Sequence, residues 1–271
     1  MAEDRKSGAG GRRDSRGASA PRAHQPPRAP RRPERARPAR PQRTDEPEST
    51  PRAGPPIPDT IEAKQLAPEI RAELSTLDRA TADTVARHLV AAGELIDEDP
   101  EAALAHAQAA RTRSGRIAAI REAVAVAAYR CGDWAQALSE FRAAKRMGST
   151  SQLLPLIADC ERGVGRPERA IELARGPEAA QLAGDDADEM RIVVAGARAD
   201  LGHIEQALAV LSSPPPDPSR TGSTAARLSY AYADTLLALG RTDDALQWFI
   251  NAAAADVDGV TDAEDRVSEL A

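Results

Sequence analysis

Histidines are the residues of this chain whose chemistry could most directly support metal binding. The four are His24, His88, His106 and His203, and only His88 and His106 stand where one helical hairpin could bring two of them together. A metal site needs further ligands, and neither a cysteine nor an acidic residue stands at ligand spacing from this pair. Histidines in such positions usually face solvent or have their hydrogen bonds satisfied within the protein. We therefore predict a structural role for both and no bound metal.

Nucleophilic and phosphate-binding patterns are equally incomplete. Cys131 and Cys160 lack the neighbouring histidine of an activated thiol, and a free cysteine usually behaves as a small buried hydrophobe. The stretch "GVGRPE" has no preceding strand and no following Lys-Ser/Thr, so it is no phosphate loop. The acidic run "DDADE" lacks the rest of a calcium loop. We expect no catalytic residue, no cofactor and no enzyme activity.

The elements that would position any site repeat along the chain. An alanine followed by leucine or isoleucine recurs five times, at spacings of 34, 33, 37 and 38 residues. We call its alanine the anchor alanine of each unit; the five are Ala103, Ala137, Ala170, Ala207 and Ala245. Twelve residues earlier each unit has a second alanine, namely Ala91, Ala125, Ala158, Ala195 and Ala233. A fixed period of this length is typical of stacked helical units.

In four of the five units a glycine between the two alanines separates two predicted helices. Gly132, Gly165, Gly202 and Gly240 stand five residues before the anchor alanine, and only the first unit differs, with Glu98. Glycine after the last turn of a helix adopts the left-handed conformation that satisfies the helix's last carbonyls. Each unit is therefore predicted to be an antiparallel helical hairpin, which must stack on its neighbours to bury its apolar face.

This pattern resembles the tetratricopeptide repeat, with its small-residue positions, its loop glycine and a second-helix Ala-x-x-x-Phe. The fourth residue after the anchor alanine is Phe141, Leu211 or Phe249 in three units, whereas the third unit has Ala174. The resemblance covers about residues 83–255 and implies an all-α, tetratricopeptide-like α-solenoid of about five hairpins. The whole chain also resembles tetratricopeptide proteins of high-GC bacteria, which implies no particular activity.

The same resemblance implies a binding groove lined by the first helices of successive units. Transferred to this chain, the lining positions are Glu122, Val126, Tyr129, Asp159, Arg162, Arg227, Tyr230 and Asp234. The family members that grip a C-terminal carboxylate use lysine and asparagine at these positions, and this chain has neither there. A groove of mixed charge with a few aromatic residues could still take an extended or helical peptide. Several of these side chains could instead simply face solvent.

The N-terminal part of the chain differs in composition from the repeats. Residues 1–57 hold 13 arginines and one lysine against seven acids, whereas the remainder has 22 basic and 35 acidic residues. The first 58 residues also contain 12 of the 21 prolines and almost no large apolar side chains. We expect residues 1–57 to form a disordered basic arm. Residues 58–80 are expected to form a helical cap that Pro68 bends or divides, before a repeat domain over 81–256 and a C-terminal capping helix over 257–271.

Binding to other molecules could use two basic regions besides the groove. Arg111, Arg113, Arg116, Arg121, Arg142, Lys145 and Arg146 lie around the second unit, and they could receive an acidic partner or simply complement helix ends. The arm could bind RNA or DNA weakly, fold back on the acidic repeats, or only aid solubility. We expect a non-catalytic adaptor that binds a protein or peptide, with an RNA- or ribosome-associated accessory protein as the alternative.

The expected location follows from what the sequence lacks. No apolar run follows the basic N-terminus as it would in an export signal, and no stretch is long enough to span a membrane. The two cysteines form no disulfide framework. These features favour a cytoplasmic protein that has no contact with a membrane.

Overall fold

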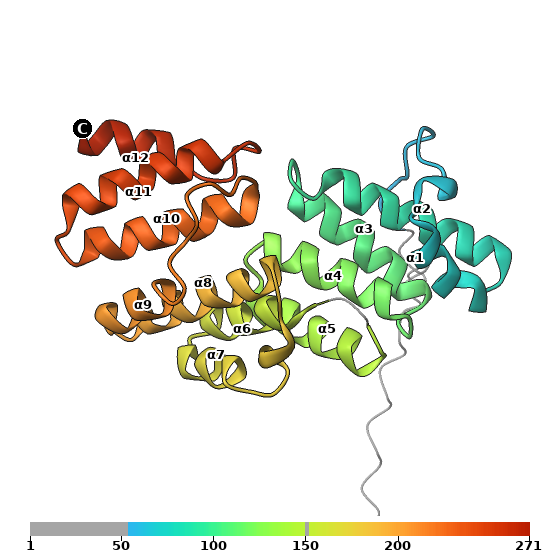
Figure 1. Cartoon of the computed structure of the whole chain (residues 1–271). Coiled ribbons are helices and arrows are strands. Elements are labelled where there is room, and N and C mark those ends of the chain that lie inside the picture. The colour runs from blue at the N-terminus through green and yellow to red at the C-terminus, as the bar shows by residue number, and fades with distance from the viewer. Residues whose placement is uncertain (1–53, 150–151) are drawn as a thin grey trace, which may run out of the picture. The chain divides into compact units, whose positions relative to one another are not determined.

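The structure is a computed structural model that describes residues 54–149 and 152–271, and all regular structure in these residues is helical. Ten α-helices of these residues pair into five antiparallel hairpins (Figure 1). Hairpins one to five are α2 (Arg79–Leu95) with α3 (Pro100–Arg113), α4 (Ala118–Arg130) with α5 (Trp134–Arg146), α6 (Leu154–Gly163) with α7 (Pro167–Ala174), α8 (Asp185–Asp200) with α9 (Ile204–Leu211), and α10 (Ser223–Ala238) with α11 (Thr242–Ala255). The predicted all-α solenoid of helical hairpins is confirmed.

The hairpins stack in chain order. The second helix of each hairpin packs against the first helix of the next, as α3 does with α4, α5 with α6, α7 with α8 and α9 with α10. The first helices also contact one another, because α2 packs against α4 and α8 packs against both α6 and α10. We call the row formed by α2, α4, α6, α8 and α10 the first-helix layer, and the row formed by their partners the second-helix layer.

The repeated alanines lie where the helices of a hairpin approach each other. All five anchor alanines are completely buried, and the five earlier alanines are at most 3% exposed. A methyl group is small enough to let two helix backbones approach closely and still fill the space between them. The alanine pairs therefore fix the spacing within each hairpin, and larger side chains fill the space between hairpins.

The predicted loop glycines have the backbone conformation that the sequence requires. Gly132, Gly165, Gly202 and Gly240 have φ values of 72°, 77°, 75° and 74°. In each of these four hairpins the next residue's N–H donates back across the helix end, as Asp133 does to the carbonyl of Ala128 and Arg241 does to that of Leu236. This is the hydrogen bond of a Schellman motif, which ends a helix at a glycine in the left-handed region.

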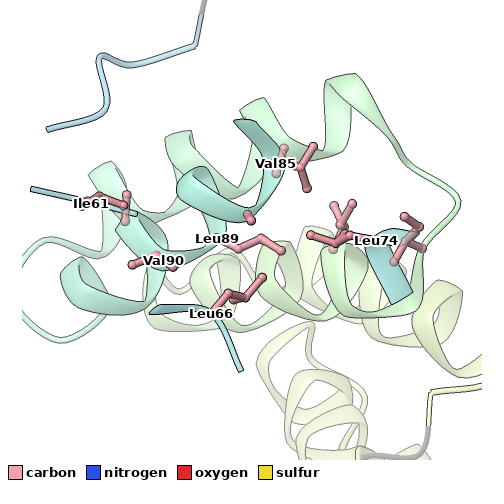
Figure 2. Packing of buried hydrophobic residues seen from close by; sticks show 11 residues of the cluster. Ile61, Leu66, Leu74, Val85, Leu89 and Val90 are labelled. Atoms are coloured by element: carbon pink, nitrogen blue, oxygen red, sulfur yellow. The ribbon is translucent and has the colours of Figure 1, made fainter. Parts of the chain in front are cut away.

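The segment before the first hairpin contains short helices only. They are the 3₁₀ turn η1 (Ala63–Gln65), α1 (Pro68–Glu73) and the 3₁₀ turn η2 (Leu74–Thr76). Pro68 is the first residue of α1 and divides the predicted capping segment. Its ring nitrogen carries no hydrogen to donate to a helical hydrogen bond, so proline suits the first position of a helix but not its interior. Figure 2 shows Ile61, Leu66 and Leu74 of this segment beside Val85, Leu89 and Val90 of α2.

At the other end, α12 (Ala263–Leu270) packs against α11. Val267 and Leu270 of α12 contact the cluster around Phe249, and the guanidinium carbon of Arg266 lies 5.2 Å from the centre of the Phe249 ring. In residues 54–149 and 152–271, no helix has both the length and the apolar character needed to span a membrane. Most of the predicted basic arm, residues 1–53, lies outside the described residues.

Candidate functional site

Tyr129 makes the first of the side-chain contacts that connect neighbouring helices of the first-helix layer. It projects from α4 on the same side as Glu122 and Val126, and all three are half-buried. Its ring meets the indole of Trp134 edge-on, with the ring centres 5.0 Å apart and the planes at 82°. The Tyr129 hydroxyl donates to Oδ2 of Asp159 on α6 at 2.5 Å. Two neighbouring first helices are thus joined through one side chain.

Arg162 extends this connection from α6 to α8. Its Nη1 donates to Oδ1 of Asp159 at 2.8 Å, and its Nε donates to Oδ2 of Asp200 at 2.8 Å. The guanidinium lies directly on Gly196 of α8, where a Cβ atom would come within 2.5 Å of the Arg162 Cζ. The missing side chain at position 196 therefore makes room for a cation that joins two first helices.

The protonation state of Tyr129 suits a donor. Burial, and after it the neighbouring Asp159 carboxylate, raises the pKa of the Tyr129 hydroxyl well above its usual value. The hydroxyl therefore stays neutral and keeps its proton for Asp159. The chain Tyr129, Asp159, Arg162 and Asp200 is a fixed polar network that crosses α4, α6 and α8.

A hollow of about 230 Å³ lies beside this network. Tyr129, Asp159 and Arg227 line it, together with Glu189 of α8 and the apolar Leu156. Arg227 of α10 forms an ion pair with Glu189, so the hollow is bounded by four first helices that polar contacts tie together. Three of the sequence-predicted residues are thus brought to one place.

A second, wider hollow adjoins the first, since Arg227 lines both. It has a volume of about 560 Å³ and is bounded by Tyr230, Ile192 and residues of the connection before α12, among them Val260. The Tyr230 ring meets Phe249 edge-on at 5.1 Å between centres, which holds the tyrosine in place. Burial, and after it Asp262, raises the pKa of Tyr230 to about 12.

The remaining predicted residues lie elsewhere. Glu122 and Val126 line a separate hollow of about 410 Å³, against Glu69 and Glu73 of α1 and the first helix of hairpin one. Asp234 is exposed, and the nearest Nη atom of Arg266 is 3.9 Å from its Oδ1. The eight predicted residues therefore divide into a central group, a group beside α1 and one residue near α12. Their part in binding stays a prediction.

Glu189 and Ile192 line these hollows but were not predicted, because the predicted set included no residue of the fourth unit. Glu189 stands 18 residues before the anchor Ala207, as Arg227 stands before Ala245, and Ile192 matches Tyr230 in the same way. Applying the register of the fifth unit to the fourth would have found both. Val260 and Asp262 could not be found in this way, because they belong to a connection that lies outside the repeat.

The basic residues around the second unit are largely engaged in ion pairs between helices. Glu140 is buried and pairs with Arg111 and Arg121, and the buried Glu161 pairs with Arg142. Lys145 pairs with Glu178 in the connection after α7. The Arg121 pair lies within hairpin two, and the others join hairpin two to its neighbours. These contacts favour the structural interpretation of the region over an acidic partner.

His88 and His106 contact each other across hairpin one. The Nδ1 atoms of His88 and His106 are 3.0 Å apart between α2 and α3, and both rings are buried. Burial lowers the pKa of both rings, that of His88 to about 4, so the pair is neutral near pH 7. Within the described residues, no group of three or more histidine, cysteine or acidic side chains could hold a metal ion. This pair is a polar contact within the core of hairpin one.

The cysteines show no sign of activation. Cys160 is buried, and burial followed by the neighbouring carboxylates Asp159 and Glu161 raises its pKa to about 12. Burial also raises the pKa of Cys131. A thiol that stays protonated is a poor nucleophile.

Comparisons with known proteins complete this description. No family model and no curated protein matches the chain. Among solved structures the chain is similar to YrrB, whose structure is described as that of a TPR protein with an unusual peptide-binding site. The identity is 17% and the TM-score is 0.43, and the match covers 74% of this chain and 99% of that one.

Proposed function

We propose that this chain is a non-catalytic protein-interaction scaffold that binds a peptide segment of its partner across the first helices of hairpins two to five. The observation that carries the proposal is the pair of adjoining hollows that share Arg227. Apolar residues, such as Leu156 and Ile192, line them together with polar and charged side chains. Surfaces that recognise peptides combine these two kinds of residue.

The fixed polar network supports a binding role for this face. Tyr129, Asp159 and Arg162 hold one another in place before any partner arrives. Ordering a side chain on binding costs about 0.5–1.5 kcal/mol for each flexible residue, and a surface that is already ordered avoids this cost. The half-buried residues of this face are therefore suited to contact a partner without rearrangement.

Charge indicates the chemistry of the partner segment. Asp159, Asp186, Glu189 and Asp262 line the two hollows, and Arg227 is the one cation among the lining residues. This excess of carboxylates favours a segment with lysine or arginine beside its apolar residues, since complementary charges speed and orient association. We therefore propose a basic, partly apolar peptide as the bound element.

An affinity capture with the full chain and with residues 58–271 tests the proposal. Each form is incubated with lysate, with and without nuclease, and bound proteins are identified by mass spectrometry. The scaffold function predicts a partner that survives both the truncation and the nuclease. Replacing Tyr230→Ala and Arg162→Glu together removes one aromatic and one network cation from the face, and capture is then expected to be lost.

Arg169→Glu provides the matched control, because Arg169 lies on α7 in the second-helix layer and undergoes the same change of charge. Circular dichroism of each variant shows whether the helices persist. The alternative, RNA or DNA binding through residues 1–57, predicts the opposite pattern. Capture would then be lost with the arm or with nuclease and would fall steeply as salt rises.

A further inference from the structure

A hollow of about 340 Å³ lies away from the two hollows of the proposed peptide site, where α7 ends against α8 and α9. Ile171 and Ala174 of α7, Met190 and Val194 of α8, and Val210 of α9 form its apolar walls. Leu182, in the connection after α7, closes one side. It uses a different side of α8 from the proposed peptide site, which contacts Asp186, Glu189 and Val193 of that helix.

A small residue at the end of a helix explains why the space is open. In hairpins two and five the fourth residue after the anchor alanine is Phe141 or Phe249, and both rings are completely buried between helices. Hairpin three has Ala174 at this position, and α7 also ends there. The volume that an aromatic ring fills in hairpins two and five is therefore left beside Ala174.

The charge of the hollow is unusual for this part of the chain. Residues 58–271 carry 22 basic and 35 acidic side chains, yet the lining of the hollow contains Arg175, Arg191 and Arg198 and none of the described acidic residues. An apolar space bordered only by cations suits a ligand with an apolar body and a negative group.

The three arginines differ in how far they are engaged. Arg191 pairs with Asp188 and donates to the carbonyls of Leu211 and Pro214, so it is fully used in holding the connection after α9. Arg175 is exposed and forms no ion pair with any described residue. Arg198 donates one Nη1 hydrogen bond to Gln206, while its Nε is buried and has no partner among the described residues. Arg175 and Arg198 are thus the cations available to a ligand.

We propose that this hollow is a binding site for an apolar carboxylate, an aromatic or branched aliphatic group that carries one negative charge. The apolar group takes the space beside Ala174, against Met190 and Val194. The carboxylate is held by Arg175 and Arg198. A free organic acid and the last residue of a protein ending in Phe or Leu share this chemistry. The site is independent of the peptide site in the first-helix layer.

Methionine methyl groups offer a direct readout. The chain has three methionines, of which Met190 forms a wall of the hollow, whereas Met147 is exposed at the end of α5 and does not line the hollow. The full chain, labelled with ¹³C at the methionine methyls, is titrated with 4-phenylbutyrate and observed by NMR. The expected result is a saturable shift of the Met190 signal while the Met147 signal stays in place.

Charge-matched probes and variants decide whether the arginines recognise the ligand. 4-Phenylbutanol and 4-phenylbutylamine have the same apolar body, and both are expected to bind about tenfold or more weakly, as the loss of a charge-assisted contact implies. Arg175→Gln and Arg198→Gln are each expected to weaken the binding of 4-phenylbutyrate. Arg169→Gln, on the exposed side of α7, serves as the control and is expected to leave this binding unchanged. Ala174→Phe fills the space and abolishes the Met190 shift.

The outcomes separate the possible sources and can overturn the proposal. N-acetylphenylalanine binding more tightly than both 4-phenylbutyrate and N-acetylphenylalanine amide would identify a protein C-terminus as the occupant. 4-Phenylbutyrate binding more tightly than N-acetylphenylalanine would identify a free acid. Equal binding of the carboxylate and the alcohol, or parallel shifts of Met147 and Met190, would refute the site. Should Ala174→Phe fail to fold, the exposed Arg175→Gln variant still decides.

Discussion

The second and third hairpins have the same frame but different interiors. Their anchor alanines, Ala137 and Ala170, are both completely buried, and their loop glycines have nearly the same φ. Four residues after the anchor, however, Phe141 is buried against Leu153, Ile157 and Cys160, whereas Ala174 is half-buried at the wall of a hollow. The repeated small residues therefore determine the backbone, and single large residues determine whether the space between hairpins is core or cavity.

Hairpin one shows that a missing aromatic residue is not sufficient to leave a hollow. It also has an alanine at this position, Ala107, yet that residue is completely buried against Ala92 and Val124. The two hairpins differ in how far the second helix continues beyond the alanine. Helix α3 continues past Ala107 to Arg113, whereas α7 ends at Ala174 itself. A hollow requires both a small side chain and the end of the helix that would have covered it.

The largest expected effect comes from giving hairpin two the residue of hairpin three. Phe141→Ala removes a completely buried ring and should lower the free energy of unfolding by about 3–5 kcal/mol, since a cavity forms in addition to the lost burial. Urea unfolding followed by circular dichroism measures this. A loss below about 1 kcal/mol would mean that hairpin two collapses around small residues as hairpin one does.

The histidine pair distinguishes the core of hairpin one from that of hairpin two. His88 has a pKa of about 4 when folded and an ordinary value of 6.5, because burial, followed by Arg113, His106 and Arg87, disfavours its charged form. As the pH falls, the unfolded chain therefore binds this proton at a higher pH than the folded chain does. The stability that depends on neutral His88 is fully present above pH 6.5 and is lost as the pH falls from 6.5 to about 4. The slope is up to about 1.4 kcal/mol per pH unit for each proton.

The double variant His88→Leu, His106→Leu isolates this contribution from that of the carboxylates. It replaces both partners with apolar groups, so no unsatisfied nitrogen remains and the acid-dependent loss over this range should shrink. His203→Asn, a change at an exposed histidine, is the control. Urea unfolding at several pH values gives the slopes. Equal slopes for the double variant and the unmodified chain would show that the buried pair does not titrate as described.

The reverse exchange, Ala174→Phe, gives hairpin three the residue of hairpin two. Because the hollow beside Ala174 already has a volume of about 340 Å³, the ring should enter with little strain. We expect stability to rise by about 1 kcal/mol, as other cavity-filling changes do. Thermal unfolding checks the sign. A fall in stability would mean that Ala174 is too close to its neighbours for a ring to fit.

The smallest effect compares two helical glycines. Gly93→Ala in α2 should raise stability by about 0.8–1 kcal/mol, since a Cβ there meets nothing within 4 Å and alanine favours the helix. Gly196→Ala should gain less, because its Cβ would displace the Arg162 guanidinium from Asp159 and Asp200. Equal gains from the two variants would indicate that the Arg162 contacts contribute nothing to stability.

The frame could be predicted from sequence because it depends on local, repeated residues. A glycine after a helix and an alanine at the closest approach have the same consequence in every unit, so five coincident patterns specify five hairpins. The meeting of His88 and His106 across hairpin one could be predicted for the same reason. Its complete burial could not, because that depends on how the preceding segment packs against α2.

The candidate site could be predicted only in part. The register identified Tyr129, Asp159 and Arg227, which line one hollow, but it could not show that Glu122 would face α1 instead. The contact between Tyr129 and Asp159 depends on the distance between hairpins, and the hollow beside Ala174 depends on where α7 ends. The repeat supplies no rule for either the distance between hairpins or the length of a helix.

Site-specific photo-crosslinking tests the central claim, that the first-helix layer binds a partner, most directly. p-Benzoylphenylalanine is placed at Gln152, an exposed residue that lines the smaller of the two adjoining hollows, or at Glu172, exposed on α7 in the second-helix layer. Each full-length variant is irradiated in lysate after nuclease treatment. The account predicts a specific crosslinked protein from position 152 that is absent from position 172 and persists in residues 58–271. Crosslinking from position 172 alone, or its loss from position 152 when the arm is removed, would contradict it.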